Sequence, residues 1–506
     1  MRADGYTPMT IGRGIRCAAA RAGGKAAIVA DGRTLTYADL TRRIARVANI
    51  GLSHLKLEAG DRVALIAPNT IDYVEIVAGL SDIGAIVATI SPRLTRAELS
   101  DILDDCSPRA IIVHHSCKDA LDPDWARQTP VIVLGADYDG LIERASDRQP
   151  ADSIAETAPF ALAYTSGTTG RPKGVLLPHR SRAITFMAMA AEYNCFGIDD
   201  HFLALAPMCH GAGFVFACAA LFFGGTTSLF PAGDPVAVLD RIGQSDITGV
   251  FMVPTQFARL FDLADATLDA RRGHRLTSII SNAAALPQPM KERAIAQFGE
   301  GLLHETYGST EGGIVTNIRP ADLLSRPGSV GLPFPGVEVE LRRPDGSIAA
   351  AGEVGELFSR APTAFTGYWQ RPGDTAETLV DGWVTVGDIA VADADGFISI
   401  VDRKKDMVVT GGLNVYPREI ENVIATLPAV REVAVIGKPD AEWGESLHAF
   451  IVPRRAGGID PVDVLARCRE QLAGYKVPRD ISFLAELPRN AGGKVLKTAL
   501  RELVVA

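Results

Sequence analysis

The segment YTSGTTGRPKGVLLPH, residues 164–179, places six small residues in a row shortly before a single lysine, Lys173. Side chains this short cannot build a hydrophobic core, and glycine loses more backbone entropy on folding than any other residue. The segment is therefore best interpreted as a loop whose backbone a ligand approaches closely. Successive N–H groups, hydroxyls and one ammonium group suit the oxygens of a polyphosphate. The loop lacks the GK[ST] ending of the Walker A motif, and the alternative to a phosphate loop is a surface turn.

Composition limits what this polyphosphate site can belong to. The chain has 506 residues, of which 47% are hydrophobic, enough for about three domain-sized units. A net charge of −9 gives no general attraction to nucleic acid or anionic membranes. The 11 lysines are few beside 40 arginines, so a lysine in a glycine-rich loop is a stronger indication of function than it would be elsewhere.

The cysteines and the apolar runs indicate a cytoplasmic location. Seven scattered cysteines contain no CxxC pair and argue against a disulfide framework, so a reducing cytoplasm is expected. The first 24 residues lack the apolar core of a signal peptide. The most apolar run, residues 214–230, is interrupted by Gly224 and Gly225 and is too short for a bilayer. We expect no membrane span.

Apolar runs that alternate with helical patterns predict a mostly parallel sheet with covering helices, an α/β fold. The expected strands of this region are residues 62–68, 84–92, 109–115, 226–230, 249–255 and 276–284. Residues 336–360 alternate strands with a PDG turn, which predicts a small antiparallel barrel or sheet. From about residue 407 the chain restarts with a helix, two strands, a helix and a strand, which predicts a separate α+β domain.

Four later segments strengthen the interpretation of the loop. They are ETYGSTEGG (305–313), VGDIA (386–390), DRKKDMVVTGGLNVYPREIE (402–421) and PRNAGGKVLK (488–497). Together with TSGTTGRPKG they resemble, in the same order, the motifs of the adenylate-forming superfamily, in particular its acyl-CoA synthetase and aryl-CoA ligase branch. The resemblance covers nearly the whole chain. Its departures are Val386, where the family commonly has threonine, and Val409 and Thr410, which replace more polar residues of some plant ligases.

The resemblance implies an ATP site with named contacts. Glu311 would hold Mg²⁺, Thr310 would contact the α-phosphate, and Tyr307 would stack on adenine. Asp388 would accept hydrogen bonds from the ribose, assisted by Arg403. The residues implied to hold the β- and γ-phosphates are Thr165, Ser166, Gly167, Thr168, Thr169, Gly170 and Lys173, and those implied to line the other face of adenine are Asn282, Ala283 and Ala284.

The chemistry explains why such residues are needed. A carboxylate is already ionised at neutral pH, so its attack on the α-phosphorus needs no general base. Charge repulsion is the obstacle, and catalysis must supply positive charge and hydrogen-bond donors. The resemblance assigns this role to Lys494, which would bridge the carboxylate and the α-phosphate; the alternative for Lys494 is a surface charge.

A second half-reaction with a thiol implies a moving C-terminal domain, because Lys494 and the thiol cannot occupy the same space. The resemblance places the hinge at Lys405, within residues 402–406, between an N-terminal domain of residues 1–401 and a lid of residues 407–506. Gly411 and Gly412 would line the pantetheine tunnel. The alternative for the hinge charges is a solvated loop.

The acyl group is expected near residues 207–214, 252–257 and 281–286. The resemblance places His210 beside the substrate carboxylate, although a lone histidine is more often structural. The segment has no acidic residue that would pair with an amino group. The neighbouring pocket residues are small or apolar and suit a hydrophobic fatty or aromatic acid; they are Met208, Cys209, Gly211, Gly213 and Ala285.

The expected function is an ATP- and Mg²⁺-dependent carboxylic acid:CoA ligase that forms acyl-AMP and then acyl-CoA. Its partners would be small molecules only, and a monomer and a homodimer both stay open. One alternative is an acyl-AMP ligase that loads a carrier protein, and another is a luciferase-like oxygenase. A third, an inactive acyl-nucleotide-binding module, would be expected to lose Lys494 or Glu311, and both are present.

Overall fold

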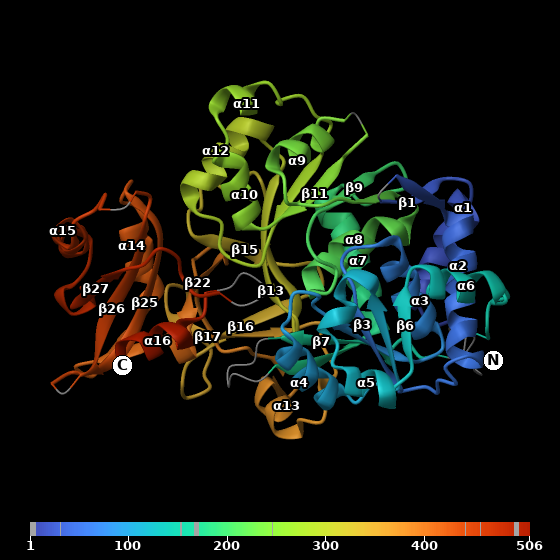
Figure 1. The fold of residues 1–506 in the computed structure, drawn as a ribbon. Coiled ribbons are helices and arrows are strands. Elements are labelled where there is room, and N and C mark those ends of the chain that lie inside the picture. The colour runs from blue at the N-terminus through green and yellow to red at the C-terminus, as the bar shows by residue number, and fades with distance from the viewer. Residues whose placement is uncertain are drawn as a thin grey trace. The chain divides into compact units, whose positions relative to one another are not determined.

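A computed structural model describes residues 7–30, 32–151, 154–165, 172–244, 246–440, 442–455, 457–489 and 495–505 (Figure 1). The chain divides into two compact units. The larger unit contains residues 1–339 and 359–384, and the smaller contains residues 340–358 and 385–506.

A seven-stranded sheet of the larger unit carries the two ends of the phosphate-loop segment. Its strand order is β18-β8-β7-β4-β3-β5-β6. The strands are β3 (Arg62–Ile66), β4 (Ile86–Ile90), β5 (Ala110–His114), β6 (Val131–Leu134), β7 (Pro159–Thr165), β8 (Lys173–Pro178) and β18 (Gly367–Tyr368). Strands β3 to β7 pair in parallel, whereas β8 and β18 are antiparallel additions. Thr165 at the end of β7 pairs with Lys173 at the start of β8.

The other large sheet has a parallel centre, β13-β12-β11-β9-β10-β1, flanked by antiparallel strands β14, β15 and β2. The strands are β1 (Ala26–Ala30), β2 (Arg33–Thr36), β9 (His201–Ala204), β10 (Thr226–Leu229), β11 (Gly249–Met252), β12 (Ser278–Ser281), β13 (Leu303–Ser309), β14 (Gly313–Ile318) and β15 (Ser329–Pro333), and the short strands β19 (Leu379–Val380) and β20 (Trp383–Val384) also belong to the larger unit. In a parallel sheet the strands end at one edge, where ligands usually bind.

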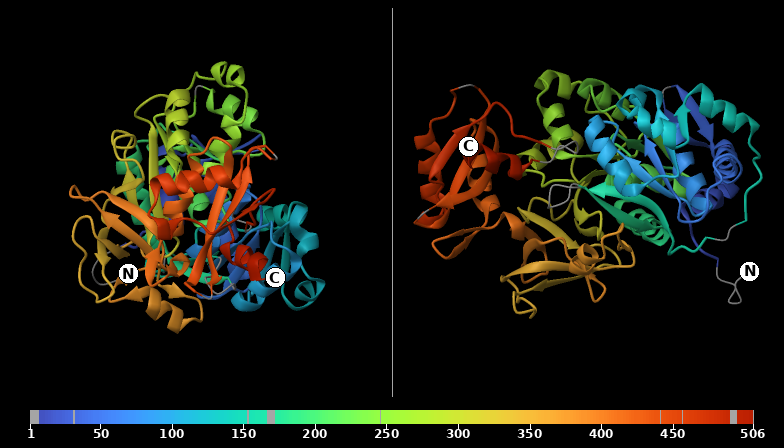
Figure 2. Two further views of the ribbon diagram at one scale, coloured as in Figure 1. Left: turned by 90° about the vertical axis from the view of Figure 1, so that its left-hand side faces the viewer. Right: turned by 60° about the horizontal axis from the view of Figure 1, so that its bottom comes forward.

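Helices fill the space between these two sheets and cover their outer faces (Figures 1 and 2). Helices α3 and α7 contact strands of both sheets, and α7 packs against α8. The helices of the larger unit are α1 (Ile11–Ala22), α2 (Tyr37–Ser53), α3 (Ile71–Asp82), α4 (Arg96–Cys106), α5 (Pro123–Gln128), α6 (Ala136–Arg144), α7 (His179–Tyr193), α8 (Gly211–Phe223), α9 (Pro235–Ile242), α10 (Pro254–Phe261), α11 (Asp265–Asp269), α12 (Gln288–Phe298) and α13 (Pro372–Thr378).

Helix α8 accounts for the most apolar part of the sequence. Its residues are apolar on every face and almost all are buried, which is the pattern of a helix enclosed by protein. It ends at Gly224, whose φ of 96° is left-handed and favours glycine. Among the described residues, no helix is long and apolar enough to cross a membrane.

The smaller unit is an α+β structure. Its antiparallel strands include β16 (Glu338–Arg342), β17 (Val354–Arg360), β21 (Asp388–Ala392) and β22 (Ile398–Arg403), which extend to the border of the unit. A separate five-stranded sheet contains β23 (Val408–Thr410), β24 (Leu413–Val415), β25 (Val430–Asp440), β26 (Gly444–Pro453) and β27 (Asp480–Phe483). Helices α14 (Pro417–Ala425) and α15 (Pro461–Gln471) pack on one face and α16 (Lys497–Val505) on the other (Figure 2).

The expected fold class is confirmed. Each predicted strand overlaps an observed one, and the region around residues 336–360 is antiparallel as expected. The compact units divide the chain at residues 340, 359 and 385. The predicted domain boundary with a hinge at residues 402–406 stays a prediction.

Candidate active site

Strand β18 connects two motifs that lie far apart in the sequence. The phenol of Tyr368 donates a hydrogen bond of 2.7 Å to the Glu311 carboxylate. The Lys173 ammonium lies 5.3 Å from the centre of the Tyr368 ring and pairs with Asp374 at 2.7 Å. Because β18 is hydrogen-bonded to β8, Tyr368 is fixed beside the strand that begins with Lys173. The lysine of the phosphate segment and the acid of YGSTE therefore belong to one network.

The turn between β13 and β14 positions the YGSTE residues. Glu311 is buried, and its backbone carbonyl accepts from Phe365 N–H at 2.8 Å. Gly313 closes the turn at a φ of 77°, a left-handed value that favours glycine. Tyr307 and Thr310 are half-buried at the end of β13 and just beyond it. The turn leaves Thr310 half-exposed while it holds Glu311 inside the protein.

A strained backbone marks the segment predicted to face adenine. Ala283 has a φ of 77°, which is uncommon for a residue with a side chain. The Asn282 amide donates to Thr306 Oγ1 at 2.6 Å, and its carbonyl oxygen accepts from Ala283 N–H. Residues 283–285 are exposed just beyond the carboxyl end of β12. Their backbone groups are accordingly available to a flat ring.

The segment before α8 is held by side chains of the other sheet. Asn69 accepts from Met208 N–H at 2.7 Å and donates to the Ala206 carbonyl, while Thr89 donates to the Cys209 carbonyl. His210 follows as the residue that caps α8, and it is half-buried. Burial, together with the nearby charge of Arg93, lowers the pKa of His210 below its usual value. The imidazole is therefore neutral at pH 7, with one nitrogen that can donate a hydrogen bond and one that can accept.

The two glycines after His210 have different surroundings. A Cβ atom on Gly211 would lie in ordinary contact, 3.8 Å from Arg182 and 3.9 Å from Thr310. A Cβ atom on Gly213 would overlap the carbonyl oxygen of Pro207. The expectation that Gly213 leaves room for the acyl group is therefore corrected: its missing side chain makes room for backbone.

In the smaller unit, strand pairing aligns Asp388 with Arg403. The Arg403 Nε lies 3.2 Å from the Asp388 carboxylate, which is buried. Residues 404–406 then form a short 3₁₀ turn in which Lys404 and Lys405 are exposed. Arg403 of this pair is the last residue of β22, and the turn follows it directly.

Gly411 and Gly412 lie in the turn between β23 and β24, both at positive φ. Gly411 N–H donates to the Trp443 carbonyl at 2.9 Å, and a Cβ atom on Gly411 would lie 2.8 Å from the indole. A Cβ atom on Gly412 would meet nothing within 4 Å. A side chain at position 411 would therefore clash with the Trp443 indole. A side chain at position 412 would meet no neighbour, and only the positive φ would disfavour it.

Several expected site residues lie outside the described residues. They are Lys494 and the phosphate-loop residues Ser166, Gly167, Thr168, Thr169 and Gly170. Three described residues that the sequence reasoning missed are Tyr368, Asp374 and Arg182. Tyr368 and Asp374 belong to none of the motifs quoted above. Arg182 lies in α7, the helix directly after the phosphate segment.

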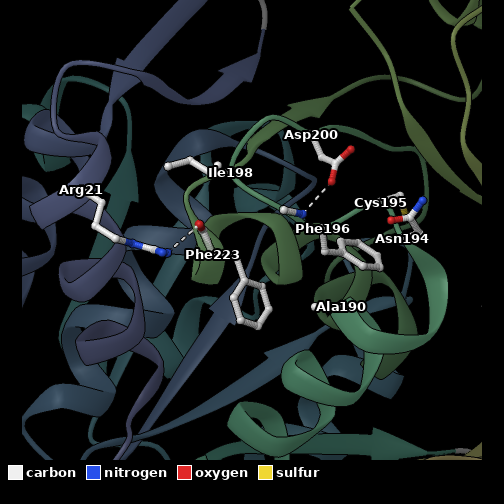
Figure 3. A pocket seen from close by; sticks show the side chains of 9 residues that line it. Arg21, Ala190, Asn194, Cys195, Phe196, Ile198, Asp200 and Phe223 are labelled. Carbon is white, nitrogen blue, oxygen red and sulfur yellow. Dashed lines mark hydrogen bonds between the residues drawn. The ribbon is translucent and has the colours of Figure 1, made fainter.

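A cavity of about 280 Å³ lies elsewhere in the larger unit (Figure 3). Within it Arg21 donates to the Phe223 carbonyl, and Asp200 accepts from Gly197 N–H. None of the expected site residues lines it. The cavity is lined by Arg21, Ala190, Asn194, Cys195, Phe196, Gly197, Ile198, Asp200 and Phe223.

Comparison with known families identifies the class of protein. Residues 15–369 match the AMP-binding enzyme family, and residues 419–494 match the C-terminal domain of AMP-binding enzymes. The chain belongs to this family, and the resemblance inferred from its motifs is confirmed.

Individual relatives narrow the class. The chain is 36% identical over 477 residues to a feruloyl-CoA synthase of an Amycolatopsis species, covering 93% of this chain and 94% of that protein. It is 33% identical to the fatty acid–[acyl-carrier-protein] ligase ScoC of Streptomyces coeruleorubidus, covering 94% and 93%. The crystal structure of ATP-bound MatB from Rhodopseudomonas palustris matches with a TM-score of 0.90 and 31% identity, covering 98% and 99%. These matches support the expected enzyme class, an AMP-forming acid:CoA ligase.

Proposed function

We propose that this protein is an ATP-dependent carboxylic acid:CoA ligase. In its first half-reaction a carboxylate oxygen bonds to the α-phosphorus of ATP, and pyrophosphate leaves. In the second, the CoA thiol gives up its proton and its sulfur bonds to the acyl carbon, and AMP leaves. The relatives named above carry out acid–thiol ligation according to their names, which supports this reaction.

The observation that carries the proposal is the network of Lys173, Tyr368 and Glu311. It unites a cation at the end of the phosphate segment with a buried carboxylate from a turn more than a hundred residues away. A cation and a carboxylate close together are what a metal–polyphosphate complex requires, since the cation meets phosphate oxygens and the carboxylate meets the metal.

Glu311 fits a divalent metal by its chemistry. Magnesium binds through one or two carboxylates together with phosphate oxygens. Tyr368 donates to one oxygen of Glu311 and leaves the carboxylate further acceptor capacity. When bound, Mg²⁺ supplies positive charge to the polyphosphate, and Glu311 is the residue that holds it.

The remaining ATP contacts follow the motif positions. Lys173 and the hydroxyl and N–H groups of residues 165–170 hold the β- and γ-phosphates, and Thr310 meets the α-phosphate. Tyr307 stacks on adenine opposite the backbone of Asn282, Ala283 and Ala284. Asp388 accepts from the ribose while Arg403 keeps its carboxylate oriented, a role supported by their 3.2 Å pair.

The second half-reaction depends on the C-terminal domain. Lys494 neutralises charge during adenylation, Lys405 is the hinge within residues 402–406, and Gly411 and Gly412 pass the pantetheine arm. The 3₁₀ turn at residues 404–406 supports a hinge, because none of its residues is buried and a short connection outside the core changes conformation at little cost.

The acid is hydrophobic, fatty or aromatic. His210 lies beside its carboxylate, and Met208, Cys209, Gly211 and Ala285 line the path of its tail. Buried Met208 and Cys209 and the apolar start of α8 support this choice. All seven cysteines are free, which is compatible with the reducing cytoplasm expected for the enzyme.

Acid-dependent exchange of pyrophosphate into ATP tests the first half-reaction. A panel of fatty, aryl and sterol side-chain acids should show exchange with some members without CoA, and AMP-forming thioester synthesis when CoA is added. The Lys494→Ala variant should lose adenylation and keep thioester formation from preformed acyl-AMP. Equal loss in both steps, or no exchange with any acid in the wild type, contradicts the proposal.

A second candidate is an acyl-AMP ligase that loads a carrier protein. The likeness to ScoC over almost the whole chain favours it specifically. The two candidates share every ATP contact and differ only in the thiol. A thiol-consumption assay with CoA against a phosphopantetheinyl carrier protein separates them, since CoA should be consumed at least as fast if the first candidate is right.

A further inference from the structure

Arg182 is a buried arginine for which the described part of the chain provides no counter-ion. It lies in the first turn of α7 and is only 3% exposed. Its Nε is buried and has no hydrogen-bond partner, and Arg182 forms no ion pair with any residue that the structure describes. Burying a cation without a partner is strongly unfavourable. Such a residue needs a reason beyond packing.

The guanidinium points to the start of α8. Arg182 Nη2 lies 3.8 Å from the position that a Cβ atom on Gly211 would occupy, and Thr310 Oγ1 lies 3.9 Å from the same point. The space beside the Gly211 α-carbon is therefore bordered by a cation and a hydroxyl. Gly211 directly follows His210, the residue assigned to the substrate carboxylate.

The charge in this space is positive and stays so at neutral pH. Burial lowers the pKa of Arg182 to about 10, which still leaves it protonated. The nearby Cys218 cannot balance it, because burial raises the pKa of that thiol well above its usual value. The N-terminus of α8, where the His210 side chain makes no capping hydrogen bond, adds the positive end of a helix dipole. Guanidinium and helix end together favour an anion.

We propose that Arg182 is the residue that binds the reacting carboxylate of the acid substrate beside His210 and Gly211, an inference that rests on the proposed ligase function. The carboxylate supplies the counter-ion that none of the described residues provides. Arg182 then holds the acid with one oxygen directed toward Thr310, where the α-phosphate is assigned. Electrostatic capture of the acid and its orientation for attack come from the same group.

The Arg182→Met variant keeps length and apolar packing but removes the charge. Without an unpaired buried cation the free protein should be more stable, so its Tm should rise. The KM for the acid in pyrophosphate exchange should increase about 10- to 100-fold, the effect of losing hydrogen bonds to a charged group. The KM for ATP should stay within about twofold. A purely structural arginine would instead lower the Tm.

Arg180→Met is the matched control. Arg180 lies two residues before Arg182, and the substitution removes the same charge from a side chain that is less buried. It should leave the KM for the acid unchanged. In Arg182→Ala, added guanidinium chloride at low millimolar concentration should restore part of kcat/KM for the acid. Arg182→Lys should give an intermediate KM.

Three outcomes would overturn the inference. Unchanged KM in Arg182→Met removes Arg182 from acid binding. A KM increase restricted to acids with a second carboxylate assigns Arg182 to that distal group instead. No exchange with any acid in the wild type refutes the ligase function itself, and with it the role of Arg182. The first outcome, when the wild type does show exchange, refutes only the role of Arg182.

Discussion

Two buried charges on the larger unit differ in how completely they are satisfied. Glu311 accepts a hydrogen bond from Tyr368, whose ring lies beside Lys173, and Lys173 is itself paired with Asp374. Arg182 has no such partner among the described residues, although it is at least as deeply buried. Glu311 thus has a hydrogen-bond donor before ligand arrives, whereas no described residue pairs with the Arg182 charge.

The difference separates preorganisation from recognition. A satisfied network keeps its geometry with or without ligand and so offers fixed charges to a transition state. An unsatisfied cation stores unfavourable free energy that a matching anion releases, which favours binding of that anion over neutral molecules. Four predictions test this comparison, from the largest expected effect to the smallest.

Glu311→Gln removes the charge of the complete network and keeps its shape. It should raise the activation free energy of adenylation by about 3 kcal/mol, the scale for deleting one electrostatic contact, and lower kcat accordingly. Folding should be little affected, because the amide oxygen can still accept from Tyr368. Pyrophosphate exchange and thermal unfolding measure the two effects, and a near-normal kcat would remove Glu311 from the site.

His179 is also buried, but unlike Arg182 it is deprotonated at neutral pH and therefore carries no unpaired charge. Burial lowers its pKa to about 4, and its Nδ1 accepts from Ile11 N–H at 3.3 Å. The folded state thus binds fewer protons than the unfolded chain between pH 4 and 6.5. Stability is fully present above pH 6.5 and should fall by about 3 kcal/mol as the pH drops to 4.

Denaturant unfolding between pH 7.5 and 4.5 measures this loss. His179→Asn keeps an acceptor for Ile11 and cannot titrate, so its stability should depend less steeply on pH. His304, whose pKa is also lowered to about 4 by burial, should keep part of the slope in that variant. Identical pH profiles of variant and wild type would contradict the prediction.

Gly213→Ala and Gly211→Ala form a matched pair at the start of α8. A methyl at 213 would overlap the Pro207 carbonyl and should destabilise the protein by about 2 kcal/mol. A methyl at 211 makes ordinary contacts with Arg182 and Thr310 and should change stability by less than about 0.5 kcal/mol. Equal Tm values for the two variants would show that the backbone before α8 can move.

Tyr368→Phe removes only the hydroxyl that donates to Glu311. The expected loss is about 1 kcal/mol, the usual net value of one hydrogen bond, observed as a lower Tm and a higher KM for ATP. The ring beside Lys173 is kept, so kcat should fall less than in Glu311→Gln. A loss as large as that of Glu311→Gln would mean that the phenol itself contacts the ligand.

The sequence could predict the strands and the motif positions because both are local. Apolar runs such as residues 62–66 and 86–90 form parallel strands, and YGSTE is a contiguous motif on which the resemblance to the family rests. It could not predict Tyr368, since that contact depends on β18 pairing with β8 across almost two hundred residues. Pairing of this kind follows from tertiary packing and has no periodic pattern.

Arg182 and Gly213 show two other limits. In the sequence Arg182 is one of 40 arginines, and only its burial without a partner distinguishes it. Gly213 was interpreted as open space because glycine lacks a side chain, but the same absence also admits backbone, and Pro207 occupies it. The sequence alone does not show whether the missing side chain of a glycine makes room for a ligand or for neighbouring backbone.

The chain also carries its own optical probes. Trp369, next to Tyr368, donates its indole N–H to the Asp105 carbonyl and lies under the Arg62 guanidinium. Trp443 contacts Gly411 in the other unit and lies under Arg479. With only four tryptophans in 506 residues, single Trp→Phe replacements isolate each emission. Trp369 thus reports on changes beside β18 and Trp443 on changes beside Gly411, so the two regions can be followed separately, by intrinsic fluorescence, in one unlabelled molecule.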